Sequence, residues 1–290
     1  MQNVTQFVAE CSSNHGQDLA RCLQFVDTAA DIGCDFVKFQ LFKVDQMWAP
    51  EILAKSSLHR ARVDWELPVH FLPFIAARCQ ERKIRFVCTP FHLQAVEDLL
   101  PYVNAYKIAS YELLWNDLLK ACVITGKPII LSTGMATVNE INEAVDSILT
   151  AGCRDLTLLH CISSYPAPPE ECNLRAIGTM RRRWFLPVGL SDHSANANVL
   201  YRAIYRWKAS MIEFHLDLDT TGAEYTQGHC WLPSQIRPII EAVSVSPVLD
   251  GSGVKRPMPS ELADRAWRRD PSDGLRPLLA TREAWQSGTE

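Results

Sequence analysis

Two lysines lie inside otherwise apolar stretches of the chain, Lys38 in FVKFQ and Lys107 in AYKIA. An unpaired ammonium group is costly to bury, so each lysine needs an anionic partner. One alternative is a structural salt bridge to Glu10 or Glu112, and the other is an anionic ligand. If both lysines and several hydroxyl groups face one cavity, they could bind a phosphate and a carboxylate group together.

Two histidines, His193 and His215, are candidate metal ligands. Imidazoles from neighbouring strand ends can meet at about 2.1 Å from one divalent ion and leave positions for water and substrate. Asp192 and Glu213 beside them could orient the rings or add ligands. A structural role in capping or packing is the alternative for such a pair. His160, which lies between two apolar residues, is interpreted as a core histidine.

The elements that must position these residues follow a regular alternation. Short apolar, β-rich segments recur, and each is followed by a segment with helical spacing of apolar residues, which is typical of parallel βα units. The expected strands are 6–10, 36–40, 85–89, 105–108, 129–132, 156–161, 187–190 and 211–215. The expected helices are 18–32, 67–82, 93–100, 113–125, 137–151, 169–182, 195–207 and 233–243, with Thr137 and Glu140 as a capping box.

Eight parallel strands close into a barrel more readily than they form so wide an open sheet, so we predict an α/β fold, a (β/α)8 TIM barrel. A doubly wound sheet is the alternative. Catalytic groups of barrel enzymes lie at the C-terminal ends of the strands. A single hydroxyl there is ordinarily a turn or helix cap, but the repetition over eight strands indicates a site. The polar residues at these positions include Glu10, Ser12, Ser13, Asn14, His15, Lys38, Gln40, Thr89, Lys107, Ser110, Glu112, Ser132, Ser163, Ser191, His193, Glu213 and His215.

Two segments depart from the alternation. Residues 42–65 are too many for an ordinary βα loop, and we expect them to fold over the mouth of the barrel. From residue 251, Gly, Pro and charged residues dominate, with one short helix expected at 260–268. We therefore expect a catalytic barrel domain over residues 1–250 and, over residues 251–290, an irregular C-terminal tail packed on or outside the barrel.

Composition excludes some classes of protein. The net charge of −4 argues against a nucleic-acid partner. No run approaches the roughly 18 apolar residues of a membrane span, and the N-terminus does not read as a secretion signal, so we expect a cytoplasmic protein without a membrane partner. The ten cysteines are scattered without a C-x-x-C pair, and we expect reduced thiols that act mostly as small core residues.

The same residues carry a resemblance to a known family. In order between about residues 6 and 262, the chain contains AECSSNHGQD, CDFVKFQLFK, VCTPF, AYKIASYE, LSTGMATVNEI, LLHCISSYPAP, VGLSDHS, IEFH and GSGVKRPMPSE. In these stretches it resembles the sialic acid synthase (N-acetylneuraminate synthase) family. The resemblance implies a transferase that condenses phosphoenolpyruvate with an aldehyde sugar, such as an N-acylhexosamine. The products would be a 2-keto-3-deoxy (nonulosonic-type) acid and phosphate, released by C–O cleavage.

The resemblance also implies a role for each matching residue. Positions that hold phosphoenolpyruvate are matched by Lys38, Thr89, Lys107, Ser110, Ser132, Ser163 and Ser191. His193 and His215 match the ligands of a divalent metal, Mn²⁺ or Mg²⁺. Positions around the acceptor sugar are matched by Glu10, Gln40, Glu112, Tyr165 and Glu224. Glu213 is in the position proposed for acid–base or water-positioning work, so the catalytic set implied is Glu213, Glu10, Glu112 and Lys107.

Three departures from the family pattern concern the sugar end of the pocket. Phe214 stands where Lys or Arg is common, and Gly222-Ala223-Glu224 replaces a Gly-Pro-Asp turn. The sequence also lacks the C-terminal antifreeze-like domain, which in many members sends an Arg into the partner subunit of a homodimer. A homodimer is still expected, with a different acceptor sugar. The candidates to replace the missing Arg are Arg268, Arg269, Arg276 and Arg282.

Two other functions are compatible with these residues. Lys107 near a barrel mouth could be the nucleophile of a Schiff-base aldolase or lyase. Alternatively, the chain could be a non-catalytic barrel that binds a sugar phosphate or serves as an assembly partner. Borohydride trapping would reveal the first, and a lack of phosphate release from phosphoenolpyruvate would favour the second.

Overall fold

The structure of the chain, a computed structural model, describes residues 5–288, apart from the side chains of residues 246–248. The chain divides into two compact units, Met1–Val245 and Ser246–Glu290. None of the helices within the described residues is both long enough and apolar enough to cross a membrane.

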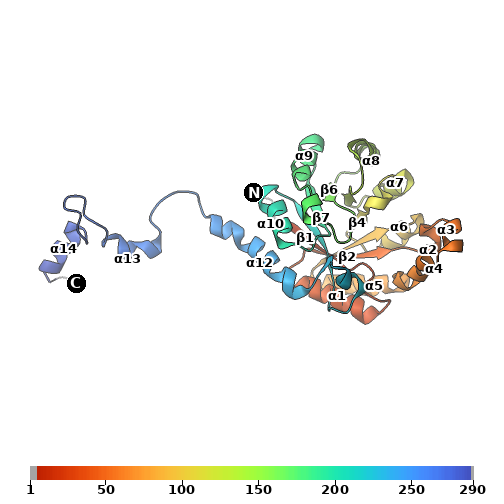
Figure 1. Ribbon diagram of the computed structural model, residues 1–290, viewed down its shortest axis with the longest axis horizontal. Coiled ribbons are helices and arrows are strands. Elements are labelled where there is room, and N and C mark those ends of the chain that lie inside the picture. Colours follow the sequence, from red (N-terminus) through yellow and green to blue (C-terminus); the bar gives the residue numbers. More distant parts are fainter. Residues whose placement is uncertain (1–4, 289–290) are drawn as a thin grey trace. The chain divides into compact units, whose positions relative to one another are not determined.

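Eight parallel strands form a closed barrel in the first unit (Figure 1). Each strand pairs with the next, and β1 pairs with β8 over five residues, so the predicted barrel is confirmed and the open doubly wound sheet is excluded. The strands are β1 Gln6–Glu10, β2 Phe36–Leu41, β3 Arg85–Pro90, β4 Ala105–Ile108, β5 Ile129–Ser132, β6 Leu156–Cys161, β7 Val188–Asp192 and β8 Met211–Leu216.

Helices surround the strands and pack their apolar faces on them (Figure 1). They are α1 Leu19–Asp31, α5 Leu72–Arg82, α6 Leu93–Leu99, α7 Asn116–Ile124, α8 Val138–Thr150, α9 Arg175–Trp184, α10 Ala197–Tyr201 and α12 Pro233–Asp250. The expected capping box at the start of α8 is present. The helices predicted over 113–125 and 169–182 begin later than expected, at Asn116 and Arg175. A 3-10 turn precedes each of them, Ser110–Glu112 before α7 and Pro169–Glu171 before α9. The predicted helix 195–207 is α10 followed by a π-helical turn, Arg202–Arg206.

The barrel interior consists of layers, because alternate side chains of each strand point inward. The lower layer is apolar and is formed by Val8, Phe36, Val87, Ala105, Ile130, Leu159 and Met211. Two residues further along each strand, the next layer is mostly polar. Its members, all buried, are Glu10, Lys38, Thr89, Lys107, Ser132, Cys161, Ser191 and Glu213. The barrel is therefore closed below by packed hydrocarbon and carries charge directly above it.

Gly189 completes the lower layer on β7. A Cβ atom at this position would lie 2.3 Å from the backbone oxygen of Met211 and 2.7 Å from Leu159 Cδ2. The large side chains of Leu159 and Met211 fill the space in its place. The absence of a side chain at Gly189 thus allows β6, β7 and β8 to approach one another.

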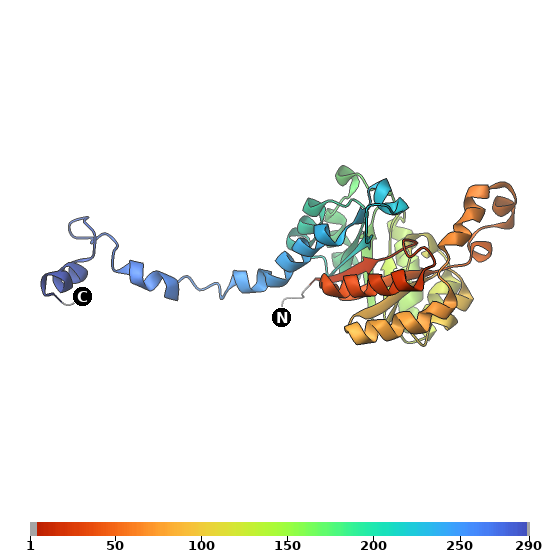
Figure 2. The same ribbon diagram turned by 90° about the horizontal axis from the view of Figure 1, so that it is seen from below.

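The segment 42–65 forms short helices at the C-terminal end of β2. They are α2 Val44–Met47, α3 Pro50–Lys55, α4 Ser57–Arg60 and the 3-10 turn Ala61–Trp65. Gln17 donates hydrogen bonds to the carbonyl oxygens of Val63 and Glu66, which ties the segment to the loop after β1. Figure 2 shows the segment projecting from the barrel. The expectation that it covers the mouth is wrong for the pocket described below, since no residue of the segment lines that pocket.

The second unit has little regular structure. It contains the 3-10 turn Pro259–Glu261 and the helices α13 Leu262–Arg265 and α14 Leu279–Gln286. Arg282 pairs with Asp273 at 2.5 Å, and the rings of Trp267 and Trp285 meet edge to face. The expectation that this tail packs on or outside the barrel stays a prediction.

The packing of β7 makes Gly189→Ala a severe substitution. We expect it to lower the free energy of unfolding by about 3 kcal/mol or more, because the colliding atoms include backbone of β8. Gly178→Ala on α9 is the matched control. Its Cβ would lie 3.2 Å from the Trp207 ring, which can shift, and alanine favours the helix, so the change should stay within about 1 kcal/mol. Urea unfolding of both variants measures the difference, and equal effects would contradict this account of the layer.

Candidate active site

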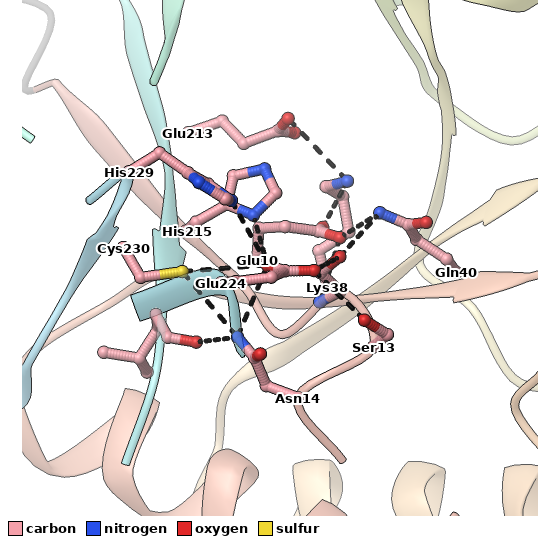
Figure 3. Close-up of polar contacts among 12 residues, drawn as sticks. Glu10, Ser13, Asn14, Lys38, Gln40, Glu213, His215, Glu224, His229 and Cys230 are labelled. Atoms are coloured by element: carbon pink, nitrogen blue, oxygen red, sulfur yellow. Dashed lines mark hydrogen bonds and ion pairs between the residues drawn. The ribbon is translucent and has the colours of Figure 1, made fainter. Parts of the chain in front are cut away.

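Four buried charges form the floor of the candidate site. Lys38 pairs with Glu10, and its Nζ lies 3.7 Å from Glu213 Oε1 (Figure 3). Lys107 Nζ lies 3.3 Å from the same Glu213 oxygen. All four side chains are buried, and two ammonium groups face two carboxylates. The salt bridge from Lys38 to Glu10 foreseen as an alternative is present, but Lys107 pairs with Glu213 rather than with Glu112.

Burial and the neighbouring charges shift the pKa values of these buried groups in different directions. Burial opposes the charge of Lys38 most strongly, yet Glu10 and Glu213 outweigh it and raise the pKa of Lys38. Burial lowers the pKa of Lys107, and the attraction of Glu213 does not offset it. Burial alone would raise the pKa of Glu213, but Lys107 and Lys38 hold it at about 2. Glu213 is therefore a carboxylate at neutral pH, and Lys107 is the lysine that would gain most from an additional anion.

Hydroxyl groups lie next to the lysines. Thr89 Oγ1 is 3.4 Å from Lys38 Nζ, and Ser191 donates to Glu213 Oε1 at 3.0 Å. The hydroxyl of Ser132 is buried and has no hydrogen-bond partner among the described residues. Buried polar groups are almost always hydrogen-bonded, so the orphaned hydroxyl of Ser132, which lines the same pocket as both lysines, is available to a ligand.

Gly134, directly after β5, brings two further hydroxyls together. Its N–H donates to Ser110 Oγ at 2.9 Å. A Cβ atom on Gly134 would lie 2.2 Å from Ser163 Oγ and 2.8 Å from Ser110 Oγ. Glycine at this position lets the hydroxyls of two neighbouring loops meet over the backbone.

Most of the predicted site residues line one pocket at the C-terminal end of the barrel. Its lining is Lys38, Gln40, Thr89, Lys107, Ala109, Ser110, Tyr111, Ser132, Cys161, Tyr165, Ser191, His193, Glu213 and His215. Glu10 is linked to this pocket through Lys38 and through Gln40, whose amide donates to it at 2.6 Å. Ser163, Glu112 and Glu224 lie outside the lining. Burial raises the pKa of Glu112 to about 7, and within the part of the chain that the structure describes its Oε2 has no hydrogen-bond partner.

His193 and His215 lie side by side, with ring centroids 5.2 Å apart. The Nδ1 of His193 is 2.8 Å from the carbonyl oxygen of Ile162, and the Nδ1 of His215 is 3.0 Å from Glu224 Oε2. Because carbonyl and carboxylate oxygens only accept, each Nδ1 carries the proton and each Nε2 has a free lone pair. Burial lowers the pKa of His193, which favours the neutral, ligating form. The pair thus fits a shared divalent ion.

Two residues beside this pair were not predicted as site residues. His229 and Cys230 follow the short helix α11 Ala223–Gln227, and Cys230 begins the two-residue strand β9 Cys230–Trp231. Strand β9 pairs with the end of β8 and places Cys230 opposite His215. The rings of His229 and His215 are 5.0 Å apart, and Tyr165 contacts both as well as His193. The adjacent His-Cys pair in GHCWLP was the only sequence signal that could have revealed them.

Arg21 on α1 holds together the loop after β1 and the loop after β8, which lie next to His229 and Cys230. Its guanidinium donates to the carbonyl oxygen of Asn14 at 2.6 Å and pairs with Asp217 at 2.9 Å and Asp219 at 3.0 Å. The loop after β1 and the loop after β8 are thereby held together. Gly222 permits the turn into α11, because a Cβ there would lie 1.8 Å from Asp217 Oδ2.

Three other histidine and aromatic positions have structural roles. His160 is buried and its Nε2 is 2.8 Å from the carbonyl oxygen of Cys172, so its interpretation as a core histidine is confirmed. His15 is also buried, and its Nδ1 accepts from the N–H of Gln17. Phe214 belongs to the core between strands and helices. Its side chain is thus outside the pocket, and the expectation that this departure from the family pattern concerns the sugar end of the pocket is wrong.

Comparison with known proteins places this barrel in a family. The NeuB family model matches residues 25–255. The chain belongs to the NeuB family. N,N'-diacetyllegionaminic acid synthase of Campylobacter jejuni is 32% identical over 271 residues, 89% of this chain and 80% of that protein. Pseudaminic acid synthase of Helicobacter pylori is 30% identical over 272 residues, 90% of this chain and 79% of that protein. The crystal structure of an N-acetylneuraminic acid (sialic acid) synthetase from Leptospira borgpetersenii, in complex with citrate, superposes with a TM-score of 0.79 at 28% identity and covers 94% of each chain.

The charge cluster predicts how its members respond to substitution. Lys38→Met should destabilise the protein by about 3–5 kcal/mol, because it leaves Glu10 buried without its cation. The double variant Lys38→Met with Glu10→Gln should recover most of this loss, since neither residue is then charged. Denaturant unfolding of both single variants and the double variant measures the coupling. Additive losses would show that the two residues do not act as a buried pair.

The raised pKa of Glu112 predicts that the free energy of unfolding depends on pH. Its folded-state pKa of about 7 exceeds the ordinary value of 4.5, so the folded protein keeps a proton that the unfolded chain releases. The stability contributed by that proton is full below about pH 4.5 and is lost as the pH rises towards 7. Glu112→Gln cannot ionise, and it should be more stable than the unsubstituted chain at pH 8 by up to about 3 kcal/mol. Unfolding at pH 5 and pH 8 tests this, and a difference independent of pH would contradict it.

Proposed function

We propose that this chain condenses phosphoenolpyruvate with an aldehyde sugar of the N-acylhexosamine type, giving a nonulosonic-type 2-keto-3-deoxy acid and phosphate. The observation that carries the proposal is one pocket lined by the orphaned hydroxyl of Ser132, by two buried lysines and by two histidines with free Nε2 atoms. Membership of a family that includes nonulosonic acid synthases supports it.

The phosphoenolpyruvate end is the charged floor of the pocket. A phosphate and a carboxylate group need several donors, and Lys38, Lys107 and the hydroxyls around them supply those donors in a buried site. An anion beside Lys107 would stabilise its ammonium form, which burial disfavours. The hydroxyls assigned to this end are those of Thr89, Ser110, Ser132, Ser163 and Ser191.

A divalent ion, Mn²⁺ or Mg²⁺, would be held by His193 and His215. When bound, it would supply Lewis-acid polarisation of the aldehyde oxygen and a position for water. The contribution of the chain itself is to hold both rings by Nδ1, which keeps both Nε2 lone pairs directed away from Ile162 and Glu224.

Glu213 is the residue we assign to proton transfer. In the proposed reaction C3 of phosphoenolpyruvate bonds to the aldehyde carbon, and the positive charge that forms at C2 takes the oxygen of water. Glu213 is ionised at neutral pH, so its carboxylate can accept the proton that this water loses. The aldehyde oxygen takes up a proton and becomes a hydroxyl group. The C2 hydroxyl then gives its proton to the departing phosphate as the bond between C2 and the phosphate oxygen breaks, which leaves the keto group.

The acceptor sugar is assigned to the outer end of the pocket. Gln40 and Tyr165 line it, and Tyr165 is 41% exposed, so its ring is accessible from the mouth. Glu10 and Glu112 complete the set that we expect to contact or protonate the sugar. Glu224 is assigned to the same end, although its carboxylate is already hydrogen-bonded to Ser12 and Ser13.

The lowered pKa of Lys107 supports a second candidate, a Schiff-base aldolase or lyase, because a neutral amine is the nucleophile in that reaction. Borohydride with substrate would trap Lys107 covalently in that case, and EDTA would not abolish activity. The condensation instead requires the second lysine and the hydroxyls, which a Schiff base does not use.

The decisive assay is phosphate release from phosphoenolpyruvate with Mn²⁺ and a panel of aldoses. We expect release that depends on an aldose and on the metal, and Lys107→Met should lower kcat/KM at least about 100-fold, because a buried charge contact to the phosphate is lost. Lys120→Met, at an exposed position of α7, is the matched control and should be as active as the unsubstituted chain. Phosphate release with no aldose dependence, or no release at all, would contradict the proposal.

A further inference from the structure

We infer that His215, Glu224, His229 and Cys230 form a binding site for an ion of the zinc class at the edge of the pocket. One ligand atom from each residue lies within 4.8 Å of the others. This inference does not rest on the proposed reaction, since the four residues would hold an ion whatever the pocket binds.

The distances around Glu224 are already close to those of a metal site. Its Oε2 lies 3.0 Å from His215 Nδ1, 3.5 Å from His229 Nε2 and 3.6 Å from Cys230 Sγ. In a tetrahedral zinc site with bonds of 2.0 to 2.3 Å, neighbouring ligand atoms are separated by about 3.3 to 3.7 Å. Three of the six edges thus need little change, and the remaining three, each at most 4.8 Å, need to contract by up to about 1.5 Å.

The two oxygens of Glu224 have different surroundings. Oε1 accepts hydrogen bonds from Ser12 at 2.5 Å and Ser13 at 3.1 Å, which fix the carboxylate from the side of the β1 loop. Oε2 faces the two imidazoles and the thiol, with Asn14 at 3.4 Å (Figure 3). An anchored carboxylate that directs one oxygen at nitrogen and sulfur atoms is the arrangement that surrounding hydrogen bonds give to a metal ligand.

The remaining ligands are buried and rigidly placed. His215, His229 and Cys230 are each less than 10% exposed. Cys230 is the register partner of His215 through the pairing of β9 with β8. The Nδ1 of His229 is buried without a hydrogen-bond partner among the described residues, so no acceptor there competes for the ring nitrogen, and the proton of a neutral ring can lie on Nδ1 while Nε2 faces Glu224 Oε2. His229 can therefore offer Nε2 as a ligand.

The chemistry of the set selects the ion. Mg²⁺ and Mn²⁺ prefer oxygen ligands, whereas a thiolate with two imidazoles and one carboxylate in a four-ligand set is typical of Zn²⁺. His215 is common to this set and to the pair with His193, and a neutral imidazole has only one free lone pair. An ion on the Nδ1 of His215 and an ion on its Nε2 thus exclude each other, so zinc at this set would withdraw His215 from the pocket.

Cobalt provides a direct test, because a thiolate bound to Co²⁺ gives a near-ultraviolet charge-transfer band. The full chain, stripped of metal with a chelator, is titrated with Co²⁺ alone. We expect the band in the unsubstituted chain, its loss in Cys230→Ser, and at least tenfold weaker Co²⁺ binding in His229→Ala. The matched controls are Cys161→Ser and His193→Ala, which should keep the band. Cys161 Sγ lies 3.9 Å from His193 Nδ1 and is thus the other thiol near a histidine of the pocket.

Each result decides the question. Absence of the band in the unsubstituted chain, its persistence in Cys230→Ser, or its loss in Cys161→Ser or His193→Ala would overturn the inference. If Cys230→Ser does not fold, as judged by circular dichroism, X-ray absorption of the zinc-loaded unsubstituted chain replaces it, with one sulfur expected at about 2.3 Å. Phosphate release is measured separately, so a missing band and a missing reaction remain distinguishable.

Discussion

The mutual neutralisation of Lys38, Glu10, Lys107 and Glu213 is the interaction on which the rest of the site depends. Charges this deep in a barrel persist only when each has a partner, and these four come from strands β1, β2, β4 and β8. Glu213 on β8 reaches Lys38 and Lys107 only when the barrel is closed, because β8 is the last of the strands and closure pairs it with β1. Closure of the barrel is therefore needed for the four charges to neutralise one another, and this neutralisation in turn determines the form of the pocket floor.

The period of two residues along each strand explains how much was predictable from sequence. Lys38 and Lys107 were identifiable because an ammonium in an apolar strand has few explanations, and the inward alternation then places them above the apolar layer. The same alternation carries His193 and His215 one layer further, at the mouth. Strand-borne parts of the site follow from local sequence, since position along the strand also gives depth and direction.

Parts carried by loops did not follow from sequence. His229 and Cys230 reach the site only through α11 and the two-residue strand β9, an excursion set by Gly222 and by the contacts of Arg21 rather than by any periodic pattern. Phe214 was misread for a related reason, because its family position suggested a pocket role while its parity on β8 turns it to the helices. Segment 42–65 was placed over the mouth from its length and from Trp48, Pro50 and the basic His59-Arg60, and neither length nor composition contains information on direction.

The floor of the pocket is carried by strands and its outer end by loops, and the two ends therefore differ in how easily their residues can be substituted. A substitution in the strand-borne floor must preserve neutrality among four buried charges, which leaves few acceptable residues. The outer end is bounded by loops whose exchange costs far less, because their backbones are not part of the barrel. Glu224, His229 and Cys230 all belong to that outer end, and they adjoin the floor through His215 and through Ser12, which is hydrogen-bonded to both Glu224 and Glu10. A change of acceptor or of metal is therefore easiest at the loop after β8, where a new ligand set can be added without disturbing the lysines that define the anion site.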